Sequence, residues 1–378
     1  ILSGPAWSIR TFRPPWAPHG PTDTGRPPDP TRPRRQDDMR RWLLECGVEL
    51  MIYPSPHRLS FEAGVPFVMA IHDLQHRLQP EFPEVSADGE WQRREYLFRN
   101  AARRATMLLA DSEVGCEDIL NCYGEFGAQR ARICVLPFLP ACSCDPAEAG
   151  LLRAHVARRY GLPQRYLFYP AQFWTHKNHS RVIEALGILK RSGGFQIPLV
   201  LTGSAEGPVR ERAFAEMQAL ARHWGVLDQI HVLGLVPTAE MAGLYAGAVA
   251  LVMPTFFGPT NIPVLEAWAL DCPVLISDIR GIREQVADAA LRVDPRSAIA
   301  IADGIHKLWT DTELRQELAT RGRARVAHYT RDDYCRRLFD AIAAAKQRVR
   351  SAAQDAPGAL HAAGDRQQSP LIPHQVGV

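Results

Sequence analysis

Short apolar segments of strand length alternate with segments of helical periodicity along most of this chain, in two successive series. The first series runs from about residue 39 to 150 and the second from about residue 151 to 335. Strands that alternate with helices form parallel sheets covered on both faces, because each helix carries the chain back across the sheet. The sequence therefore predicts an α/β fold with two Rossmann-like parallel-sheet domains in tandem.

The expected strands are short and apolar, and helical periodicity separates most of them. They are 49–53, 66–71, 106–110 and 132–137 in the first series, and 166–169, 197–202, 229–233, 249–254, 273–277 and 290–293 in the second. Helices are expected at 40–47, 90–105, 112–123, 147–160, 208–224 and 331–350. The chain of 378 residues has room for two such domains.

The two ends of the chain differ from the body in composition. Residues 1–38 hold nine of the thirty prolines and little apolar periodicity, so we expect a proline-rich disordered or non-native leader. Residues 336–350 are expected to form a helix that returns from the second domain, and residues 351–378 a polar, disordered tail.

The charge, the apolar runs and the cysteines of the chain limit which partners and ligands are expected. A net charge of +3 with 22% charged residues lacks the basic excess of a nucleic-acid-binding protein, so no nucleic acid partner is expected. No apolar run approaches the ~20 residues that a membrane span needs. The eight cysteines contain no CxxC pair, and Cys142 and Cys144 form only a CxC, so we expect reduced thiols, a cytoplasmic protein and no metal site.

The loops that follow the strands of the second series are the first place to look for a ligand, because doubly wound sheets bind ligands at that edge. After the first of these strands, Lys177 and Asn178 directly precede an expected helix. Free N–H groups at a helix N-terminus, with an ammonium beside them, favour a phosphate. A solvated loop lysine is the alternative. Gly203 and the main chain around Val236 follow the next two strands and are weaker signals.

The loop after strand 249–254 leads into a second helix N-terminus. Gly258 frees the turn, Asn261 is the expected N-cap, and Pro263 suits the first helical turn.

Glu266 is the one charged residue of this apolar helix. A buried carboxylate is unfavourable unless it is paired or hydrogen-bonded. The vicinal hydroxyls of a ribose would satisfy it, and an ion pair with Arg280 or Arg283 is the alternative.

The stretch from Tyr166 to Tyr329 resembles the C-terminal domain of retaining glycosyltransferases of family four, which have the two-domain GT-B fold. The resemblance rests on the ordered spacing of Lys177, Asn178, Gly203, Gly234 and the segment from Gly258 to Glu266. It implies that residues 151–335 bind a nucleotide-sugar donor. Residues 39–150 would be a partial, acceptor-side domain that lacks the family's first strand and glycine-rich turn.

The resemblance also assigns roles to single residues. Lys177 would hold the donor diphosphate and Glu266 the ribose, while main-chain groups of Gly258, Pro259, Thr260 and Asn261 would contact the phosphates and the sugar. Two positions depart from the family pattern: Gln172 stands where an arginine is usual, and Gly258 stands where a glutamate opens the Glu-x7-Glu motif. Thr260 and Asn261 would then take over near the donor sugar.

The first series gives weaker signals. His72 and Asp73 end a strand where such enzymes often present a polar pair to the donor sugar, so we expect them to be catalytic; the alternative is a structural histidine capped by Asp73. The 110–113 segment resembles the next such loop. The arginine-rich helix 90–104 could face an anionic membrane, although a solvated helix face is the plainer interpretation.

These observations predict a retaining glycosyltransferase that uses neither a metal nor a cofactor. It would move a sugar from a nucleoside-diphosphate sugar to a saccharide or lipid-linked saccharide, in cell-surface polysaccharide or glycolipid synthesis. It would act in the cytoplasm or at the inner face of the membrane. A non-catalytic nucleotide-sugar-binding protein and a nucleotide-sugar epimerase are the alternatives. A dehydrogenase is not supported, because no GxGxxG follows a strand.

Overall fold

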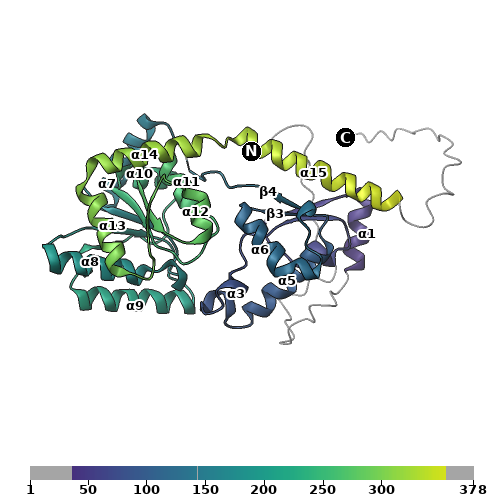
Figure 1. The fold of residues 1–378 in the computed structure, drawn as a ribbon, viewed down its shortest axis with the longest axis horizontal. Helices are drawn as coiled ribbons and strands as arrows, with labels where there is room; N and C mark the ends of the chain where they lie inside the picture. The colour runs from purple at the N-terminus through teal and green to yellow at the C-terminus, as the bar shows by residue number, and fades with distance from the viewer. Residues whose placement is uncertain (1–35, 143, 355–378) are drawn as a thin grey trace, which may run out of the picture.

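The computed structural model describes residues 36–142 and 144–354, which form two α/β halves side by side (Figure 1). The expected leader and tail lie mostly outside these residues. At the boundaries, the first helix begins at Asp37 and the last ends at Gln354, so each extends a few residues beyond the range that the sequence predicts. Among the described residues, no helix is long and apolar enough to cross a membrane.

The N-terminal half is a four-stranded parallel sheet in the order β1-β2-β3-β4. Strands β2 and β3 are buried along their whole length, as their apolar sequence predicts. The strands are β1 (Met51–Tyr53), β2 (Phe67–Ala70), β3 (Met107–Ala110) and β4 (Ile133–Val135); the helices are α1 (Asp37–Glu45), α2 (Leu59–Glu62), α3 (Gln75–Leu78), α4 (Pro83–Ser86), α5 (Glu90–Arg104) and α6 (Glu113–Tyr123). All four strands predicted for this half are confirmed.

The C-terminal half is a six-stranded parallel sheet in the order β10-β9-β8-β5-β6-β7. Helices α8, α9 and α13 cover one face, and α7, α10, α11 and α14 cover the other (Figure 1). The strands are β5 (Leu167–Pro170), β6 (Leu199–Thr202), β7 (Ile230–Val232), β8 (Ala250–Met253), β9 (Val274–Ser277) and β10 (Leu291–Val293); the helices are α7 (Pro146–Tyr160), α8 (His179–Gly193), α9 (Pro208–Trp224), α10 (Thr238–Gly247), α11 (Ile262–Ala269), α12 (Arg280–Val286), α13 (Ala298–Thr310) and α14 (Thr312–Ala327). All six predicted strands are confirmed.

The order of the strands in this sheet reverses between β5 and β8. From β5 the chain proceeds outward through β6 to β7, and β8 then pairs on the other side of β5. The loops after β5 and β8 therefore leave the sheet side by side, and such a switch point is where doubly wound sheets bind ligands. This topology brings the Lys177 loop and the 254–261 loop together.

The last helix, α15 (Arg331–Gln354), returns to the N-terminal half and packs on its sheet (Figure 1). Leu338, Ala341 and Ala345 of α15 lie against apolar residues of β2 and β3, namely Val68, Ala70, Met107 and Leu109. The core of the N-terminal half is thus completed by the C-terminal end of the described chain.

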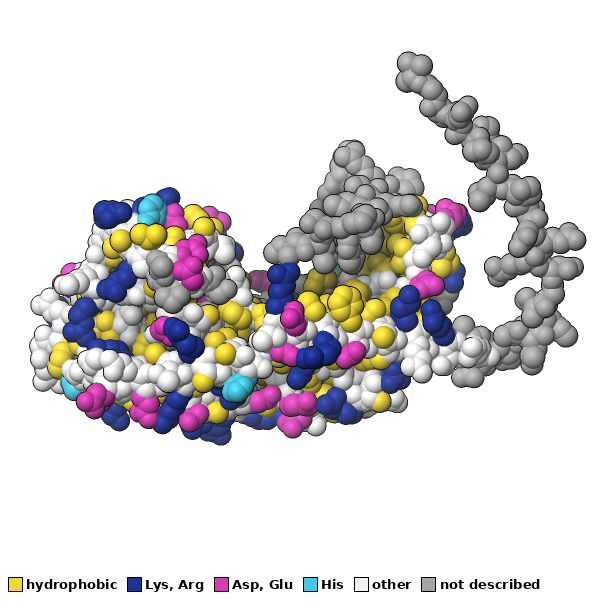
Figure 2. Space-filling view, turned by 90° about the horizontal axis from the view of Figure 1, so that it is seen from above, with side chains coloured by type: hydrophobic (Ala, Val, Ile, Leu, Met, Phe, Trp, Pro, Cys, Tyr) yellow, Lys and Arg dark blue, Asp and Glu magenta, His cyan; other side chains and the backbone are white. Residues whose placement is uncertain are grey.

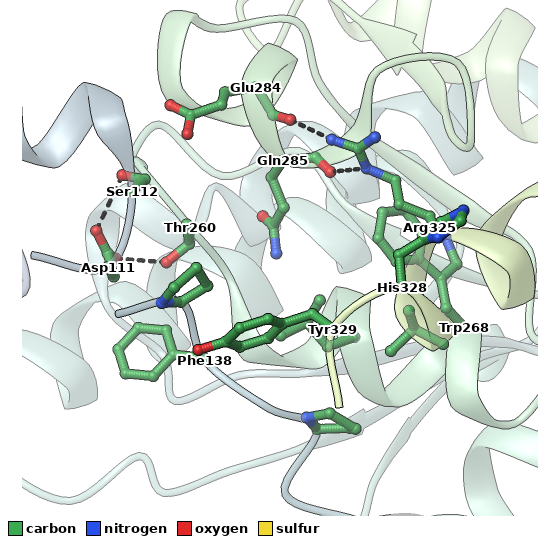
Figure 3. A pocket seen from close by; sticks show the side chains of 14 residues that line it. Asp111, Ser112, Phe138, Thr260, Trp268, Glu284, Gln285, Arg325, His328 and Tyr329 are labelled. Carbon is green, nitrogen blue, oxygen red and sulfur yellow. Dashed lines mark hydrogen bonds between the residues drawn. The ribbon is translucent and has the colours of Figure 1, made fainter. Parts of the chain in front are cut away.

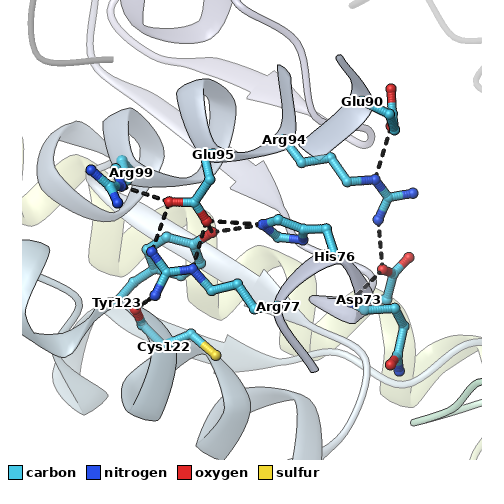
Figure 4. Close-up of polar contacts among 10 residues, drawn as sticks. Asp73, His76, Arg77, Glu90, Arg94, Glu95, Arg99, Cys122 and Tyr123 are labelled. Atoms are coloured by element: carbon cyan, nitrogen blue, oxygen red, sulfur yellow. Dashed lines mark hydrogen bonds and ion pairs between the residues drawn. The ribbon is translucent and has the colours of Figure 1, made fainter. Parts of the chain in front are cut away.

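The surface carries both signs of charge. In the view of Figure 2, acidic and basic side chains of the described residues are interspersed on the exposed face. On helix α5, Arg93 and Arg94 pair with Glu90 and Arg99 pairs with Glu95. Figure 4 shows the pairs of Arg94 and Arg99. These pairs favour the interpretation of α5 as an ordinary protein surface rather than a membrane-facing helix.

Candidate functional site

A cavity of about 310 Å³ lies between the two halves, at the loops that follow their strands. The N-terminal half contributes residues from the loops after β2 and β3, from α4 and from α5, while the C-terminal half contributes the two loops of the switch point. The lining residues are His72, Asp73, Glu84, Val85, Arg94, Asp111, Phe138, Trp174, His176, Lys177, Phe257, Gly258, Thr260 and Asn261. We call this cavity the cleft.

Lys177 brings an unpaired positive charge into the cleft. The loop after β5 is fixed at this point, since the hydroxyl of Tyr169 donates to the carbonyl oxygen of Lys177 at 2.5 Å. Among the described residues, the ammonium makes no ion pair or side-chain hydrogen bond. Burial lowers the pKa of Lys177 to about 8, against the attraction of Asp73 and Glu84. A buried cation without a partner favours an anionic ligand.

Asn178 has a different position from the one predicted. It precedes α8 in the left-handed conformation, and its amide group donates to the carbonyl oxygens of Pro254 and Pro295, both at 2.8 Å. Asn178 is 6% exposed, and its side chain holds three loops together. The side chain therefore has a structural role that positions Lys177, and the expected contact of Asn178 with the donor stays a prediction.

The loop from β8 to α11 is held by contacts with both halves of the protein. The side-chain amide of Gln75 donates to the carbonyl oxygen of Gly258 at 3.0 Å, and the hydroxyl of Thr260 donates to Asp111. Pro259 packs against Gly281, where a Cβ atom would approach the proline Cα to 2.3 Å. The loop is thus shaped by contacts across the cleft.

Asn261 occupies the N-cap position of α11, but its side chain does not cap the helix. The amide instead donates to the carbonyl oxygen of Phe257 at 3.3 Å, while Gln285 bonds both main-chain groups of Asn261. The capping prediction is right about the position and wrong about the side chain, which bonds Phe257 instead of the N–H groups of the first turn. Pro263 lies in the first turn, as predicted.

Glu266 lies outside the lining of the cleft and is half-buried. It accepts a hydrogen bond of 2.6 Å from the hydroxyl of Tyr245, and the thiol of Cys142 lies beside it. The alternative pairing with Arg280 or Arg283 is wrong. Arg280 pairs with Glu117 and Asp118, and Arg283 pairs with Asp278.

His72 lines the cleft with a defined tautomer. Its Nε2 lies 2.9 Å from the carbonyl oxygen of Pro54, which can only accept, so Nε2 carries the proton. In the neutral ring, Nδ1 is then free to accept a hydrogen bond. Asp73 does not cap His72; its carboxylate accepts from Arg94 at 2.7 Å and from the main chain of Gln75 at 3.0 Å.

Asp111 is a site residue that the sequence prediction named only within a loop. It is 5% exposed and accepts hydrogen bonds from Ser112, at 3.0 Å, and from Thr260 of the opposite half. Burial raises the pKa of Asp111 to about 6, although these hydrogen bonds and the nearby His72 lower it. Its position directly after the buried strand β3 is the feature of the sequence from which Asp111 could have been predicted as a site residue.

Gly203 and Gln172 lie next to each other at the edge of the sheet. Gly203 has a φ of +132°, and a Cβ atom there would come within 2.4 Å of the carbonyl oxygen of Ala171. Its N–H donates to the carbonyl oxygen of Gly234 at 2.8 Å, two residues before the half-buried Val236. Only glycine allows these loops to approach so closely.

A second cavity of about 290 Å³ lies on the other side of Asp111, Phe138 and Thr260, which line both cavities (Figure 3). Its walls include Trp268 and Tyr329, whose buried hydroxyl has no hydrogen-bond partner among the described residues. This hinge cavity lies where the chain passes between the two halves, at residues 137–140 and 325–329.

Among the described residues, five sets of polar contacts join the two halves around the cleft. In addition to the Gln75–Gly258 and Asp111–Thr260 bonds, His176 pairs with Glu84 and Arg280 pairs with Glu117 and Asp118. The carboxylate of Glu284 accepts from the main-chain N–H groups of residues 113 and 114 at 3.0 and 2.9 Å, at the start of α6. The two halves are therefore in direct contact on several sides of the cleft.

Residues 158–325, which contain the switch point, Lys177 and Glu266, match the family model described as glycosyl transferases group 1. This part of the chain is therefore similar to the group 1 glycosyltransferases. Curated relatives agree with this assignment. O-antigen chain mannosyltransferase B of Escherichia coli is 26% identical over 281 residues, covering 73% of this chain and 68% of the relative. A D-inositol 3-phosphate glycosyltransferase of Xylanimonas cellulosilytica is 28% identical over 252 residues, covering 64% and 57%.

The chain spans 68%, 57%, 63% and 56% of the length of four curated glycosyltransferases that it matches. Among solved structures, HepE from Anabaena in complex with UDP-glucose superposes with a TM-score of 0.61 at 17% identity, covering 84% of this chain and 82% of HepE. WaaG, a glycosyltransferase involved in lipopolysaccharide biosynthesis, has a TM-score of 0.59 at 21% identity, with coverages of 80% and 79%. These likenesses confirm the GT-B fold.

Proposed function

We propose that this group 1 glycosyltransferase moves a sugar, with retention of anomeric configuration, from a nucleoside-diphosphate sugar to a hydroxyl acceptor in the cleft. The ammonium of Lys177, which is half-buried and has no ion-pair partner among the described residues, carries the proposal. It lies at the switch point of the C-terminal sheet, where the diphosphate of a donor would meet both the lysine and the main chain of residues 258–261.

The donor would extend from the cleft toward Glu266. One Glu266 oxygen already accepts from Tyr245, which orients the carboxylate and leaves acceptor capacity for ribose hydroxyls. The donor sugar would then lie between residues 258–261 and the N-terminal half, with a hydroxyl donating to Nδ1 of His72. Asp73, which is neutralised by Arg94, would position this loop rather than take part in bond breaking.

In the proposed reaction, the bond between the anomeric carbon and the diphosphate breaks as the acceptor oxygen bonds the same face of that carbon. The acceptor proton passes to the departing phosphate oxygen. Lys177 would stabilise the charge that develops on the diphosphate, in a closed cleft that excludes water. We propose that no metal takes part, and activity retained in EDTA would support this.

The names of the relatives support a role in cell-surface polysaccharide or glycolipid synthesis. They include an O-antigen chain mannosyltransferase and an enzyme of lipopolysaccharide biosynthesis. We propose a saccharide or lipid-linked saccharide acceptor, and a site of action in the cytoplasm or at the inner face of the membrane.

The direct test is turnover. The protein would be incubated with UDP-glucose and with a guanosine-diphosphate sugar, each with a panel of simple glycosides as acceptors, with and without EDTA. Release of the nucleoside diphosphate, together with a product whose anomeric configuration matches that of the donor by NMR, would establish the proposal. Tight donor binding without product would instead identify a non-catalytic binding protein, and a changed donor sugar would identify an epimerase.

The ribose contact gives a smaller, specific prediction. Glu266→Gln should weaken binding of a nucleoside and of its diphosphate alike, each by roughly 1 to 2 kcal/mol, because both contain the ribose that the carboxylate would hold. Titration calorimetry of the two ligands measures this. Tyr245→Phe is the matched control, since it removes only the hydrogen bond that orients Glu266 and should have a smaller effect. Unchanged affinity in Glu266→Gln would assign the carboxylate to Tyr245 alone.

A further inference from the structure

Arg210 lies beside the cleft without a carboxylate partner. It belongs to the first turn of α9, which follows the close approach of Gly203 to residues 171 and 172. Its guanidinium donates to the side-chain oxygen of Gln172 at 2.7 Å and lies 4.7 Å from the centre of the Trp174 ring. Two neutral side chains, Gln172 and Trp174, therefore fix the position of this cation.

Arg210 differs in this respect from Arg94, the other arginine at the cleft. Arg94 lines the cleft, but Asp73 and Glu90 both pair with it at 2.7 and 2.9 Å, so its charge is neutralised. Arg210 forms no ion pair with any described carboxylate, although acidic residues such as Glu206 and Glu211 are close in sequence. Lys177 and Arg210 are thus two cations at this edge of the sheet that form no ion pair with a described carboxylate.

The loop from β5 to α8 connects these two charges. Gln172 and Trp174 hold Arg210, Lys177 follows three residues later, and Trp174 and Lys177 both line the cleft. A diphosphate carries more negative charge than one ammonium neutralises, and a planar guanidinium can bind two phosphate oxygens at once. Trp174 contacts Arg210 and lines the same cavity as Lys177, an arrangement that suits a ligand with two linked phosphates.

We propose that Arg210, held by Gln172 and Trp174, is the second cation that binds the diphosphate of the nucleotide-sugar donor. This rests on the proposed function, because it concerns the same ligand in the same cleft. It assigns to Gln172 a positioning role: the amide holds a guanidinium that comes from another helix. It also makes Trp174 the ring on which that guanidinium is stacked.

The test compares UDP and GDP with the nucleosides uridine and guanosine by titration calorimetry, at two salt concentrations. Arg210→Ala should weaken binding of the preferred diphosphate about tenfold and leave the matching nucleoside unchanged, because only the diphosphate carries the charge that Arg210 meets. The dependence of diphosphate affinity on salt should also become shallower. Arg212→Ala is the matched control: Arg212 lies two residues further along α9 and is exposed, and its loss should change neither ligand.

A rescue variant separates a charge effect from a structural one. Gln172→Arg combined with Arg210→Ala places a guanidinium at the position from which Gln172 holds Arg210, and should restore most of the diphosphate affinity. Equal affinities of Arg210→Ala and the unchanged protein for the diphosphate would overturn the inference, as would an equal loss on the nucleoside or a failure of the rescue. The diphosphate affinity of Lys177→Ala is measured alongside. If Lys177→Ala weakens diphosphate binding and Arg210→Ala does not, the inference about Arg210 fails and the proposed function stands. If the unchanged protein binds neither diphosphate, the proposed function fails with it.

Discussion

Lys177→Ala is expected to lower the affinity for a nucleoside diphosphate about 100-fold, or about 2.7 kcal/mol, while the nucleoside binds almost as before. The ammonium is buried in the cleft without a partner, so a bound diphosphate gains a charge-assisted contact that water does not replace. Titration calorimetry with both ligands measures the difference. An equal loss for both ligands would mean that Lys177 only shapes the loop.

The pH dependence of this affinity provides an independent check. The pKa of Lys177 is lowered to about 8 by burial, so the free protein carries the ammonium below pH 8 and loses it as the pH rises. Diphosphate affinity should therefore fall between about pH 7.5 and 9, and the fall should be absent in Lys177→Ala. Lys190→Ala, which removes an exposed lysine further along α8, is the control and should retain the fall.

Glu95→Ala is expected to destabilise the N-terminal half by roughly 3 to 5 kcal/mol. Glu95 is 3% exposed and is the common partner of His76, Arg77, Arg99 and Tyr123 (Figure 4). Hydrogen bonds from these groups outweigh the burial that would raise the pKa of Glu95 and hold it well below its usual value. Without Glu95, two arginines and a buried histidine lose their common partner.

The measurement is denaturant unfolding, with hydrogen exchange in α5 and α6 to report on the N-terminal half separately, because a two-domain chain need not unfold in one step. Glu125→Ala is the control, since Glu125 is exposed in the same half and should change stability by less than about 0.5 kcal/mol. If Glu95→Ala is no less stable than this control, the network contributes little to stability.

The strands of both sheets could be predicted because each one is a short apolar run that can be recognised without knowing its partners. The apolar runs at 249–254 and 273–277 are too short for typical helices, and both form strands inside the sheet. Lys177 was predicted from the rule that ligands bind beyond the carboxyl ends of parallel strands, and the reversal of strand order at β5 places it there. Periodicity and topology together were enough to find the cleft.

The partners of individual side chains were not predictable in the same way. Asn178 bonds carbonyl groups 76 and 117 residues away, and Asp111 bonds Thr260 from the other half. These contacts depend on how the loops and the two sheets meet, which neither hydrophobic pattern nor motif spacing specifies. Glu266 is a similar case: its conspicuous charge was read correctly as needing a partner, but the hydroxyl of Tyr245 on α10 could not be identified from the sequence.

The return of α15 to the N-terminal half restricts how the cleft can open. Two chain segments, near residues 137–140 and 325–331, connect the halves, so their relative motion is closer to rotation about one axis than to free separation. A rotation of this kind separates every contact across the cleft in the same movement, including the Asp111–Thr260 bond and the Arg280 ion pairs. We therefore expect the rate of ligand exchange to depend on the combined strength of these contacts more than on any one of them.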